Sequence, residues 1–210
     1  MAGEPYSWMA RWYDAVFEPV LGHAKQLGVD LHQPRPGDLV LDVGCGTGAQ
    51  LALYRRFGCR LAGIDPAPAM VARASRKLGP AARIHLGSAT AIPYPDASVD
   101  LVLFSMMLHE LAQDIRGAVL AEAARVLRSD GRIVVLDYHP GPLTVPRGVL
   151  ARPLIYAVEW MAGRDHFRHH LEFLAAGGVP AVADSHGLHV EVGRVIKGGN
   201  FGLFLLRAEK

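Results

Sequence analysis

The sequence has few cysteines, little net charge and no long apolar run. Its 210 residues include only Cys45 and Cys59, so neither a disulfide scaffold nor a paired-cysteine zinc site is expected. A formal net charge of +2 gives no sign of nucleic-acid binding. The most apolar stretch, Gly148–Gly163, is too short to cross a bilayer and is broken by charges and a proline. The first residues lack a signal-peptide pattern, so we expect a cytoplasmic protein.

Apolar, strand-like segments alternate with helical segments through the middle of the chain. The segments that are expected to form strands are Leu39–Val43, Cys59–Asp65, Ala82–Gly87, Asp100–Leu108 and Arg132–His139. Those that are expected to form helices between them are Thr47–Phe57, Ala67–Leu78 and Ile115–Leu127. Strands that are apolar on both faces and alternate with helices predict a parallel sheet covered by helices. An "RSDGR" turn is expected before the fifth strand.

The two ends of the chain have different patterns. Residues 6–28 and the apolar stretch within Pro140–Gly163 are expected to be helical, as is His166–Ala176. Two alternating segments, Leu188–Ile196 and Asn200–Glu209, flank a short Lys-Gly-Gly turn and predict a hairpin at one sheet edge. We therefore expect an α/β fold with a mostly parallel seven-stranded sheet and one antiparallel strand near the C-terminus.

A glycine-rich turn, "DVGCGTG", follows the strand Leu39–Val43 and opens the next helix. Such a turn lets a ligand approach the backbone closely. A phosphate-binding loop would need Lys and Ser or Thr after the glycines, but Ala49 and Gln50 stand there. The G-x-G-x-G spacing also departs from the G-x-G-x-x-G of dinucleotide sites, which disfavours a nicotinamide oxidoreductase. The third candidate ligand is S-adenosylmethionine.

The glycine turn and the segments after it resemble class I S-adenosylmethionine-dependent methyltransferases. The resemblance is carried, in the family's order, by "VLDVGCGTG", the acid Asp65, "GSATAIPYPDASVDLVLFSMMLHEL" and "EAARVLRSDGRIVVLDY". These motifs span roughly residues 35–140, and the closest likeness is to the ubiquinone/menaquinone-biosynthesis-like (methyltransferase type 11) group. The resemblance implies a Rossmann-like methyltransferase fold and S-adenosylmethionine as the cofactor.

The resemblance also implies which residues bind the cofactor. Asp42 would hold the methionyl ammonium group, and Asp65 would accept hydrogen bonds from the ribose diol. Ser88 stands where the family commonly has an Asp for the adenine amino group. The alternatives are that Asp42 braces the turn and that Asp65 caps the next helix, a role compatible with binding. The residues expected to bind the cofactor are Tyr13, Asp42, Gly44, Cys45, Gly46, Gly48, Asp65, Pro66, Met70, Ser88, Ala89 and Ser105.

Histidines are the candidates for chemistry at the methyl acceptor. His109 and His139 follow the fourth and fifth strands, where either could deprotonate or orient an acceptor. The alternative for His109 is that it braces the loop after the strand. His166, His169 and His170 have helical spacing, but no H-E-x-x-H motif is present, so no metal site is expected.

We expect a single methyltransferase domain over residues 1–210. Within it, residues 1–34 would form a helical lid, 35–139 the cofactor-binding core, 140–187 a substrate cap with its helix, and 188–210 the C-terminal strands.

The expected activity is methyl transfer from S-adenosylmethionine to a small, partly apolar molecule such as a quinol, an amine or a thiol. One alternative is N-methylation of a phospholipid or other lipid amine through peripheral contact with a membrane. Another is a non-catalytic regulatory or partner subunit that binds S-adenosylmethionine. No nucleic-acid partner is expected, and the chain would act as a monomer or homodimer.

Overall fold

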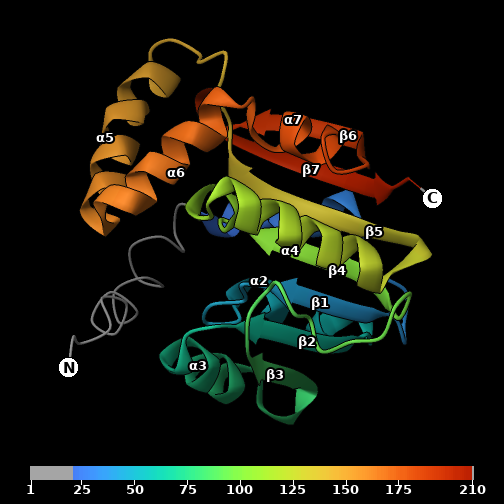
Figure 1. The fold of residues 1–210 in the computed structure, drawn as a ribbon. Coiled ribbons are helices and arrows are strands. Elements are labelled where there is room, and N and C mark those ends of the chain that lie inside the picture. Colours follow the sequence, from blue (N-terminus) through green and yellow to red (C-terminus); the bar gives the residue numbers. More distant parts are fainter. Residues whose placement is uncertain (1–20, 210) are drawn as a thin grey trace.

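The computed structural model of the protein describes residues 21–209, which form one sheet with helices on both faces (Figure 1). The sheet has seven strands in the order β3-β2-β1-β4-β5-β7-β6. Its strands are β1 (Leu39–Val43), β2 (Arg60–Asp65), β3 (Ala82–Leu86), β4 (Val99–Ser105), β5 (Leu127–Tyr138), β6 (Leu188–Ile196) and β7 (Phe201–Ala208). β7 pairs antiparallel with both β5 and β6, and the other pairs are parallel. The predicted sheet, hairpin and antiparallel strand are confirmed.

The helices and strands differ from the expected ones in three places. The helices are α2 (Ala49–Ala52), α3 (Pro68–Leu78), α4 (Gln113–Val126), α5 (Arg147–Ala162), α6 (Arg164–Ala175) and α7 (Gly178–Asp184), and residues 21–31 are also helical. The single helix predicted over Thr47–Phe57 is wrong, because α2 is short and a separate 3₁₀ turn, η1 (Arg55–Phe57), ends at Gly58 with φ +67°. α7 was not predicted, since seven residues are too few for a helical period.

The third difference lies in the predicted "RSDGR" turn, which the structure includes within β5. The pairing of β5 with β4 shifts register between Val99 and Leu101, so the strand bulges there and does not end. Gly131 permits the bulge, because a Cβ at this position would lie 2.9 Å from the Asp100 carbonyl oxygen.

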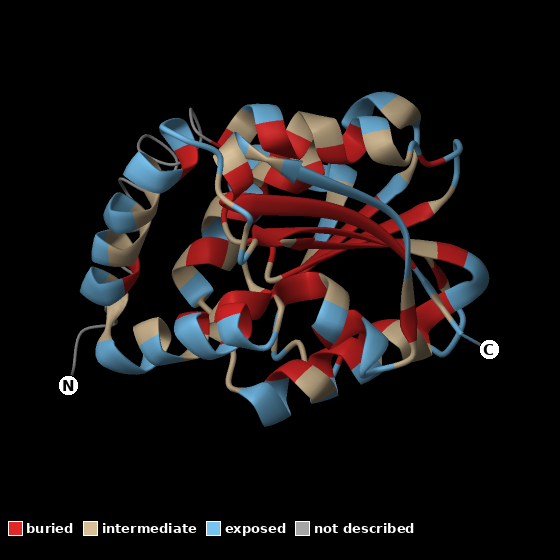
Figure 2. Cartoon of the chain, turned by 90° about the horizontal axis from the view of Figure 1, so that it is seen from above, coloured by how far each residue is buried: buried red, intermediate tan, exposed pale blue. Residues whose placement is uncertain are grey.

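The centre of the sheet is the core of the molecule. Every residue of β1 is buried, and β4 and the second half of β5 are nearly as buried. Figure 2 shows these strands enclosed between two layers of helices whose outward sides are exposed. Burial on both faces explains why these strands lack the polar alternation seen in β6, which is mostly exposed at the sheet edge.

The topology brings the carboxyl ends of several strands to the same side of the sheet. β1, β2, β4 and β5 are parallel, so the glycine turn, Asp65, Ser105 and Tyr138 all lie on this side. α5 and α6 pack against each other, and α6 packs on the 3₁₀ turn η3 (Leu108–Glu110) that follows β4. The α5–α6 pair therefore stands beside the carboxyl ends of the strands (Figure 1). Ligands of open α/β sheets bind just outside the carboxyl ends of the strands.

Arg125 of α4 holds the loop between β3 and β4. Its guanidinium donates hydrogen bonds to the backbone carbonyls of Ile92 and Tyr94 and to the carboxylates of Glu122 and Asp96. We expect Arg125→Ala to lower the free energy of unfolding by about 1–3 kcal/mol, mainly because two loop carbonyls lose their charged donor.

Chemical denaturation of the variant and of Arg128→Ala measures this loss. Arg128 is half-exposed and pairs with Asp100 and Asp130 through one nitrogen at 3.3 and 3.9 Å, so its replacement should cost less than about 0.5 kcal/mol. Equal losses in the two variants would contradict the role given to the loop carbonyls.

Candidate cofactor and substrate site

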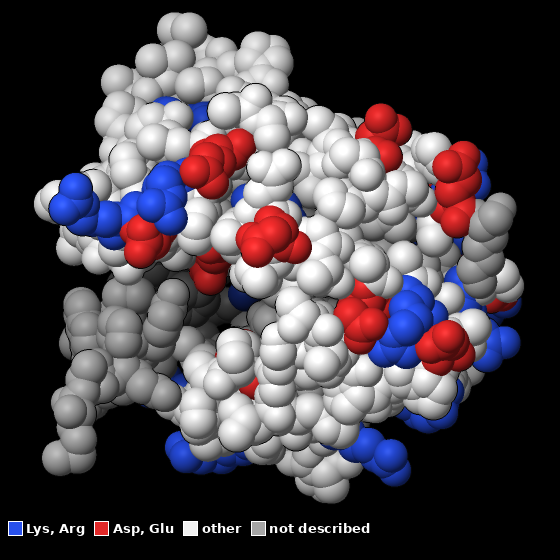
Figure 3. All heavy atoms as spheres, viewed as in Figure 1, with Lys and Arg blue, Asp and Glu red and all other residues white. Residues whose placement is uncertain are grey.

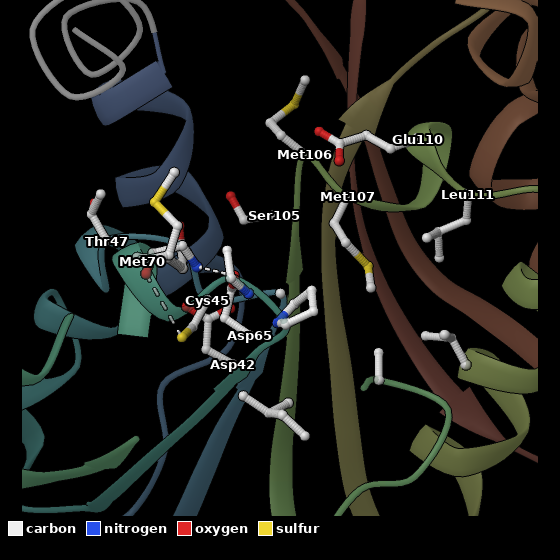
Figure 4. Close-up of a pocket in the computed structure, with 18 of the residues that line it drawn as sticks. Asp42, Cys45, Thr47, Asp65, Met70, Ser105, Met106, Met107, Glu110 and Leu111 are labelled. Carbon is white, nitrogen blue, oxygen red and sulfur yellow. Dashed lines mark hydrogen bonds between the residues drawn. The ribbon is translucent and has the colours of Figure 1, made fainter. Parts of the chain in front are cut away.

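A cavity of about 480 Å³ opens at the carboxyl ends of β1, β2 and β4 (Figure 4). Most residues that were expected to bind the cofactor line it: Asp42, Gly44, Cys45, Gly46, Asp65, Pro66, Met70, Ser88, Ala89 and Ser105. Gly48 does not line the cavity, and Tyr13 lies outside the described residues. The structure thus gathers residues from four separate motifs around one space.

The three glycines of the turn have different tasks. All have positive φ, which favours glycine. A Cβ on Gly46 would meet nothing within 4 Å, so this backbone is open to the cavity. A Cβ on Gly44 would lie 2.8 Å from Met107 Cγ. A Cβ on Gly48 would lie 2.9 Å from Leu78 Cδ1, so Gly48 allows the turn to pack against α3 and has no side facing the cavity.

Asp65 is fixed at the cavity by two backbone groups. The Gly46 N–H donates a hydrogen bond to its Oδ2 at 2.8 Å, and the Ala67 N–H donates one to its Oδ1 at 2.9 Å. Burial raises the pKa of Asp65, and the two N–H donors oppose that rise. Each oxygen keeps a second acceptor position. Asp65 therefore braces the glycine turn and can still accept hydrogen bonds from the two hydroxyl groups of a diol.

Asp42 is a buried acid that accepts no hydrogen bond from residues 21–209. Its exposed fraction is 1%, and among the described residues neither carboxylate oxygen has a hydrogen-bond partner. Burial raises its pKa to about 7, the nearby Lys25 lowers it, and Asp65 raises it further. The Ser105 hydroxyl, on the same cavity wall, is also buried and without a partner in the described part of the chain. Unsatisfied buried acceptors are costly, and a ligand with a cationic donor would satisfy them.

The other side of the cavity is largely apolar and was not predicted. The residues that form this apolar wall are Met106, Met107, Leu111, Ile115 and Val119. Glu110 also lines it; burial raises its pKa, and the charge on His109 lowers it. Figure 4 shows Met106, Met107, Glu110 and Leu111 on the side of the cavity away from Asp42 and Asp65. In the sequence these residues belong to the stretch "SMMLHEL", whose apolar residues are equally typical of a buried core, so the stretch does not indicate a cavity wall.

Residues before β1 and around the start of α2 complete the cavity. Leu21 and Lys25 line it from the helical residues 21–31, and Thr47 and Gln50 line it from the start of α2. None of these four residues was expected at the site from the sequence. Lys25 is buried, and its charge acts on Asp42. The cavity therefore holds one cationic side chain, among the described residues, beside its most buried acid.

His109 does not line the cavity but lies at the centre of a buried polar group. Its Nδ1 is 2.6 Å from Asp137 Oδ1, and its Nε2 is 3.5 Å from Glu159 Oε2. Burial alone would lower the pKa of His109, but the two carboxylates raise it to about 10. His109 thereby joins β5 to α5, as in the bracing alternative. Its catalytic role stays a prediction.

His139 also lies away from the cavity wall. Its Nδ1 accepts a hydrogen bond from the Gly141 N–H at 3.1 Å, and its ring stacks on Phe204. Burial lowers its pKa. The two histidines expected to face the acceptor therefore lie near the strand ends but contact protein groups, and a catalytic role for His139 stays a prediction.

Comparison with known proteins identifies the class. The family described as "Methyltransferase domain" matches residues 41–135. Demethylmenaquinone methyltransferase from Tropheryma whipplei is 37% identical over 127 residues, covering 58% of this chain and 49% of the relative. Nocamycin O-methyltransferase from Saccharothrix syringae is 40% identical over 146 residues, covering 64% and 50%. The chain spans about half the length of these curated relatives.

Among solved structures, a chain from the complex between the Haloferax volcanii Trm112 methyltransferase activator and a methyltransferase has the same fold. Its TM-score is 0.74 at 19% identity, and each chain is covered completely. Fold and site thus define a Rossmann-like methyltransferase. Residues 41–135 match the Methyltransferase domain family, and this part of the chain is a class I S-adenosylmethionine-dependent methyltransferase domain. S-adenosylmethionine is the cofactor of that family, as the sequence predicted.

Proposed function

We propose that the protein transfers a methyl group from S-adenosylmethionine to a small, partly apolar molecule. The observation that carries the proposal is the division of one cavity into two halves. One half is polar and contains the open backbone of Gly46, the carboxylate of Asp65 held by two backbone N–H groups, and Asp42, which has no hydrogen-bond partner within the described part of the chain. The other half is the apolar wall, interrupted by the carboxyl group of Glu110.

The polar half fits the two ends of the cofactor. Asp42 and Ser105 supply unsatisfied acceptors, which suit an ammonium group. Asp65 has acceptor positions left for ribose hydroxyls. Ser88 lines the cavity near the site expected for adenine. Its hydroxyl is 2.8 Å from the Thr90 hydroxyl, so it already shares a hydrogen bond within the protein. When bound, the cofactor supplies an electrophilic methyl group, and the protein has to orient an acceptor toward it.

The apolar wall and Glu110 are the features that would select the acceptor. Met106 and Met107 present flexible apolar side chains, which adapt to irregular ligands. The raised pKa of Glu110 brings this carboxyl group closer to neutral pH, where it could take a proton from an acceptor hydroxyl, amine or thiol. A quinol-like, amine or thiol acceptor therefore suits this half of the cavity.

The lipid-amine alternative has one observation in its favour. α5 exposes Leu150, Leu154 and Met161, each about 70% exposed. Charges of both signs are interspersed on the face shown in Figure 3, so a broad basic membrane-binding surface is not visible on this side of the described residues. No helix within residues 21–209 is long and apolar enough to span a bilayer. A lipid acceptor would have to be reached by surface contact.

Thermal denaturation with S-adenosylhomocysteine tests cofactor binding. We expect the product to raise the melting temperature of the wild-type protein, whereas NAD should not. Asp65→Ala should weaken binding by about 10–100-fold, because two charge-assisted hydrogen bonds are lost. Asp130→Ala, which removes an exposed acid at the start of β5, should respond like the wild type. Stabilisation by NAD alone would reject the proposal.

A labelled-methyl transfer assay then identifies the acceptor class. Quinols, amines, thiols and phospholipid vesicles are offered separately to the wild-type protein. Label in a quinol, amine or thiol supports the proposal, and label only in vesicles supports the lipid alternative. Tight cofactor binding without any labelled acceptor would favour the non-catalytic subunit.

A further inference from the structure

Next to the cavity lies a largely buried cluster of imidazole and carboxylate groups, which we call the His-Glu cluster. It consists of His109 from η3, Glu159 from α5 and His166 from α6. One ligand-type atom from each residue lies within 4.8 Å of the other two. Glu159 is 6% exposed and His109 is 2% exposed. Three such ligands from three elements are the donor set of a typical metal site in proteins.

The distances are close to those that a metal ion needs. Zinc–nitrogen and zinc–oxygen bonds of about 2.0–2.2 Å place tetrahedral ligand atoms about 3.3–3.5 Å apart. His109 Nε2 is 3.5 Å from Glu159 Oε2. His166 Nε2 is 2.6 Å from the same oxygen, which is a hydrogen-bond distance. A metal ion would replace that proton, and the two atoms would separate by less than about 1 Å.

The groups around the cluster resemble the outer shell of a metal centre. His109 holds its other nitrogen, Nδ1, 2.6 Å from Asp137 Oδ1, and Tyr138 donates a hydrogen bond to Glu159 Oε1 at 2.8 Å. Ligating histidines typically donate their second N–H to a carboxylate, and ligating carboxylates are themselves hydrogen-bonded. The cluster therefore already has the orienting partners that a bound ion requires.

An independent observation concerns His170, one turn of α6 from His166. Its exposed fraction is 0%, and neither ring nitrogen has a hydrogen-bond partner among the described residues. Its Nδ1 lies 3.9 Å from Glu159 Oε2. An unsatisfied imidazole in such a place is unusual, because buried polar groups are nearly always paired. His170 is outside the group of ligand atoms that lie within 4.8 Å of one another, so its Nδ1 would have to move closer to become the fourth ligand of a bound ion.

We propose that His109, Glu159 and His166, with His170 as the fourth ligand, bind one zinc ion that joins the α5–α6 pair to η3 and β5. Imidazole and carboxylate groups are zinc ligands, and four protein ligands would leave no open coordination position, which is what separates structural from catalytic zinc sites. No metal site was expected from the sequence, because the ligands come from three separate elements and none of the proposed histidines stands in an H-E-x-x-H motif. This inference does not depend on the proposed methyl transfer.

The test uses the full, untagged chain. Elemental analysis after gel filtration should give about one zinc per chain, and removal with a strong chelator should lower the melting temperature. Added Zn²⁺ should restore it, whereas Mg²⁺ should not. In the chelator-treated protein, Co²⁺ should give the intense visible absorption of a tetrahedral site, which needs no variant for its interpretation.

Two variants separate a metal site from a hydrogen-bonded ionic cluster. His166→Gln should weaken zinc binding at least about 100-fold, because it removes a direct ligand. His169→Gln, on the same helix and of similar burial, should bind zinc like the wild type. Its Nδ1 is 3.0 Å from the Glu110 carbonyl oxygen and lies outside the cluster. A chain that fails to retain or bind zinc, or equal affinity in both variants, would overturn the proposal.

Discussion

Replacing Asp42 with asparagine should flatten the pH dependence of the protein's stability. In the folded protein, burial raises the pKa of this carboxyl group from 3.8 to about 7. Between these two values the folded state holds a proton that the unfolded state has lost. The free energy of unfolding therefore falls as the pH rises from about 4 to about 7 and then levels off. The asparagine amide does not titrate, so this contribution disappears in the variant.

The expected size is large for one side chain. A full proton difference over about three pH units corresponds to about 4 kcal/mol, so we expect a contribution of about 2–4 kcal/mol. Urea denaturation at a series of pH values from about 4 to about 8 measures the difference between wild type and Asp42→Asn. Asp130→Asn is the control, because its carboxylate is 77% exposed and stays in water in both states. Parallel curves for wild type and Asp42→Asn would contradict the prediction.

The same substitution links stability to binding. An ammonium group beside Asp42 favours its ionised form, so S-adenosylhomocysteine should bind the wild type more weakly as the pH falls below about 7. Asp42→Asn should bind weakly at every pH, because the anionic acceptor is lost. A residue that destabilises the free protein and strengthens ligand binding is a common compromise at functional sites. Calorimetric titration on either side of this pH, at about 6 and about 8, separates this effect from a loss of folding.

The cofactor half of the cavity could be predicted because its signals are local. Asp42 lies near the end of β1, the glycine turn follows at once, and Asp65 ends the neighbouring strand β2. Parallel strands bring their carboxyl ends together, so residues that follow two neighbouring strands in the sequence lie close together in the fold. Gly48 shows the limit of this reasoning. It belongs to the same motif, but its role is to let α3 approach the turn.

The acceptor half depends on contacts that sequence spacing does not encode. Met106 follows β4 with φ +57°, and the 3₁₀ turn after it presents Met107 and Glu110 to the cavity. An apolar pair after a buried strand gives the same pattern whether it faces the core or a ligand. The His-Glu cluster is harder still, because His109 meets Glu159 only through the packing of α5 and α6 on η3. For that reason the predicted catalytic role of His109 rested on its place after β4 alone.

Asp137 is the residue whose loss should destabilise the fold most. It is fully buried, and it accepts hydrogen bonds from the Leu108 N–H at 2.9 Å and the Tyr138 N–H at 2.7 Å. It also pairs with His109 Nδ1 at 2.6 Å. Asp137→Ala leaves these donors buried without an acceptor and removes the charge that balances the imidazole. The free energy of unfolding should fall by about 3–5 kcal/mol.

Chemical denaturation of Asp137→Ala and of the wild type measures this loss of unfolding free energy. A chelator is present in both experiments, so that no bound metal contributes. Asp130→Ala on the same strand is the matched control and should change stability by less than about 0.5 kcal/mol, because its side chain is exposed. Asp137→Asn should fall between the two, since its amide oxygen can still accept from one backbone N–H while the imidazole loses its anionic partner. If Asp137→Ala were no less stable than Asp130→Ala, the buried acid would not be what holds η3 against the end of β5. The α5–α6 pair would then depend on apolar packing alone.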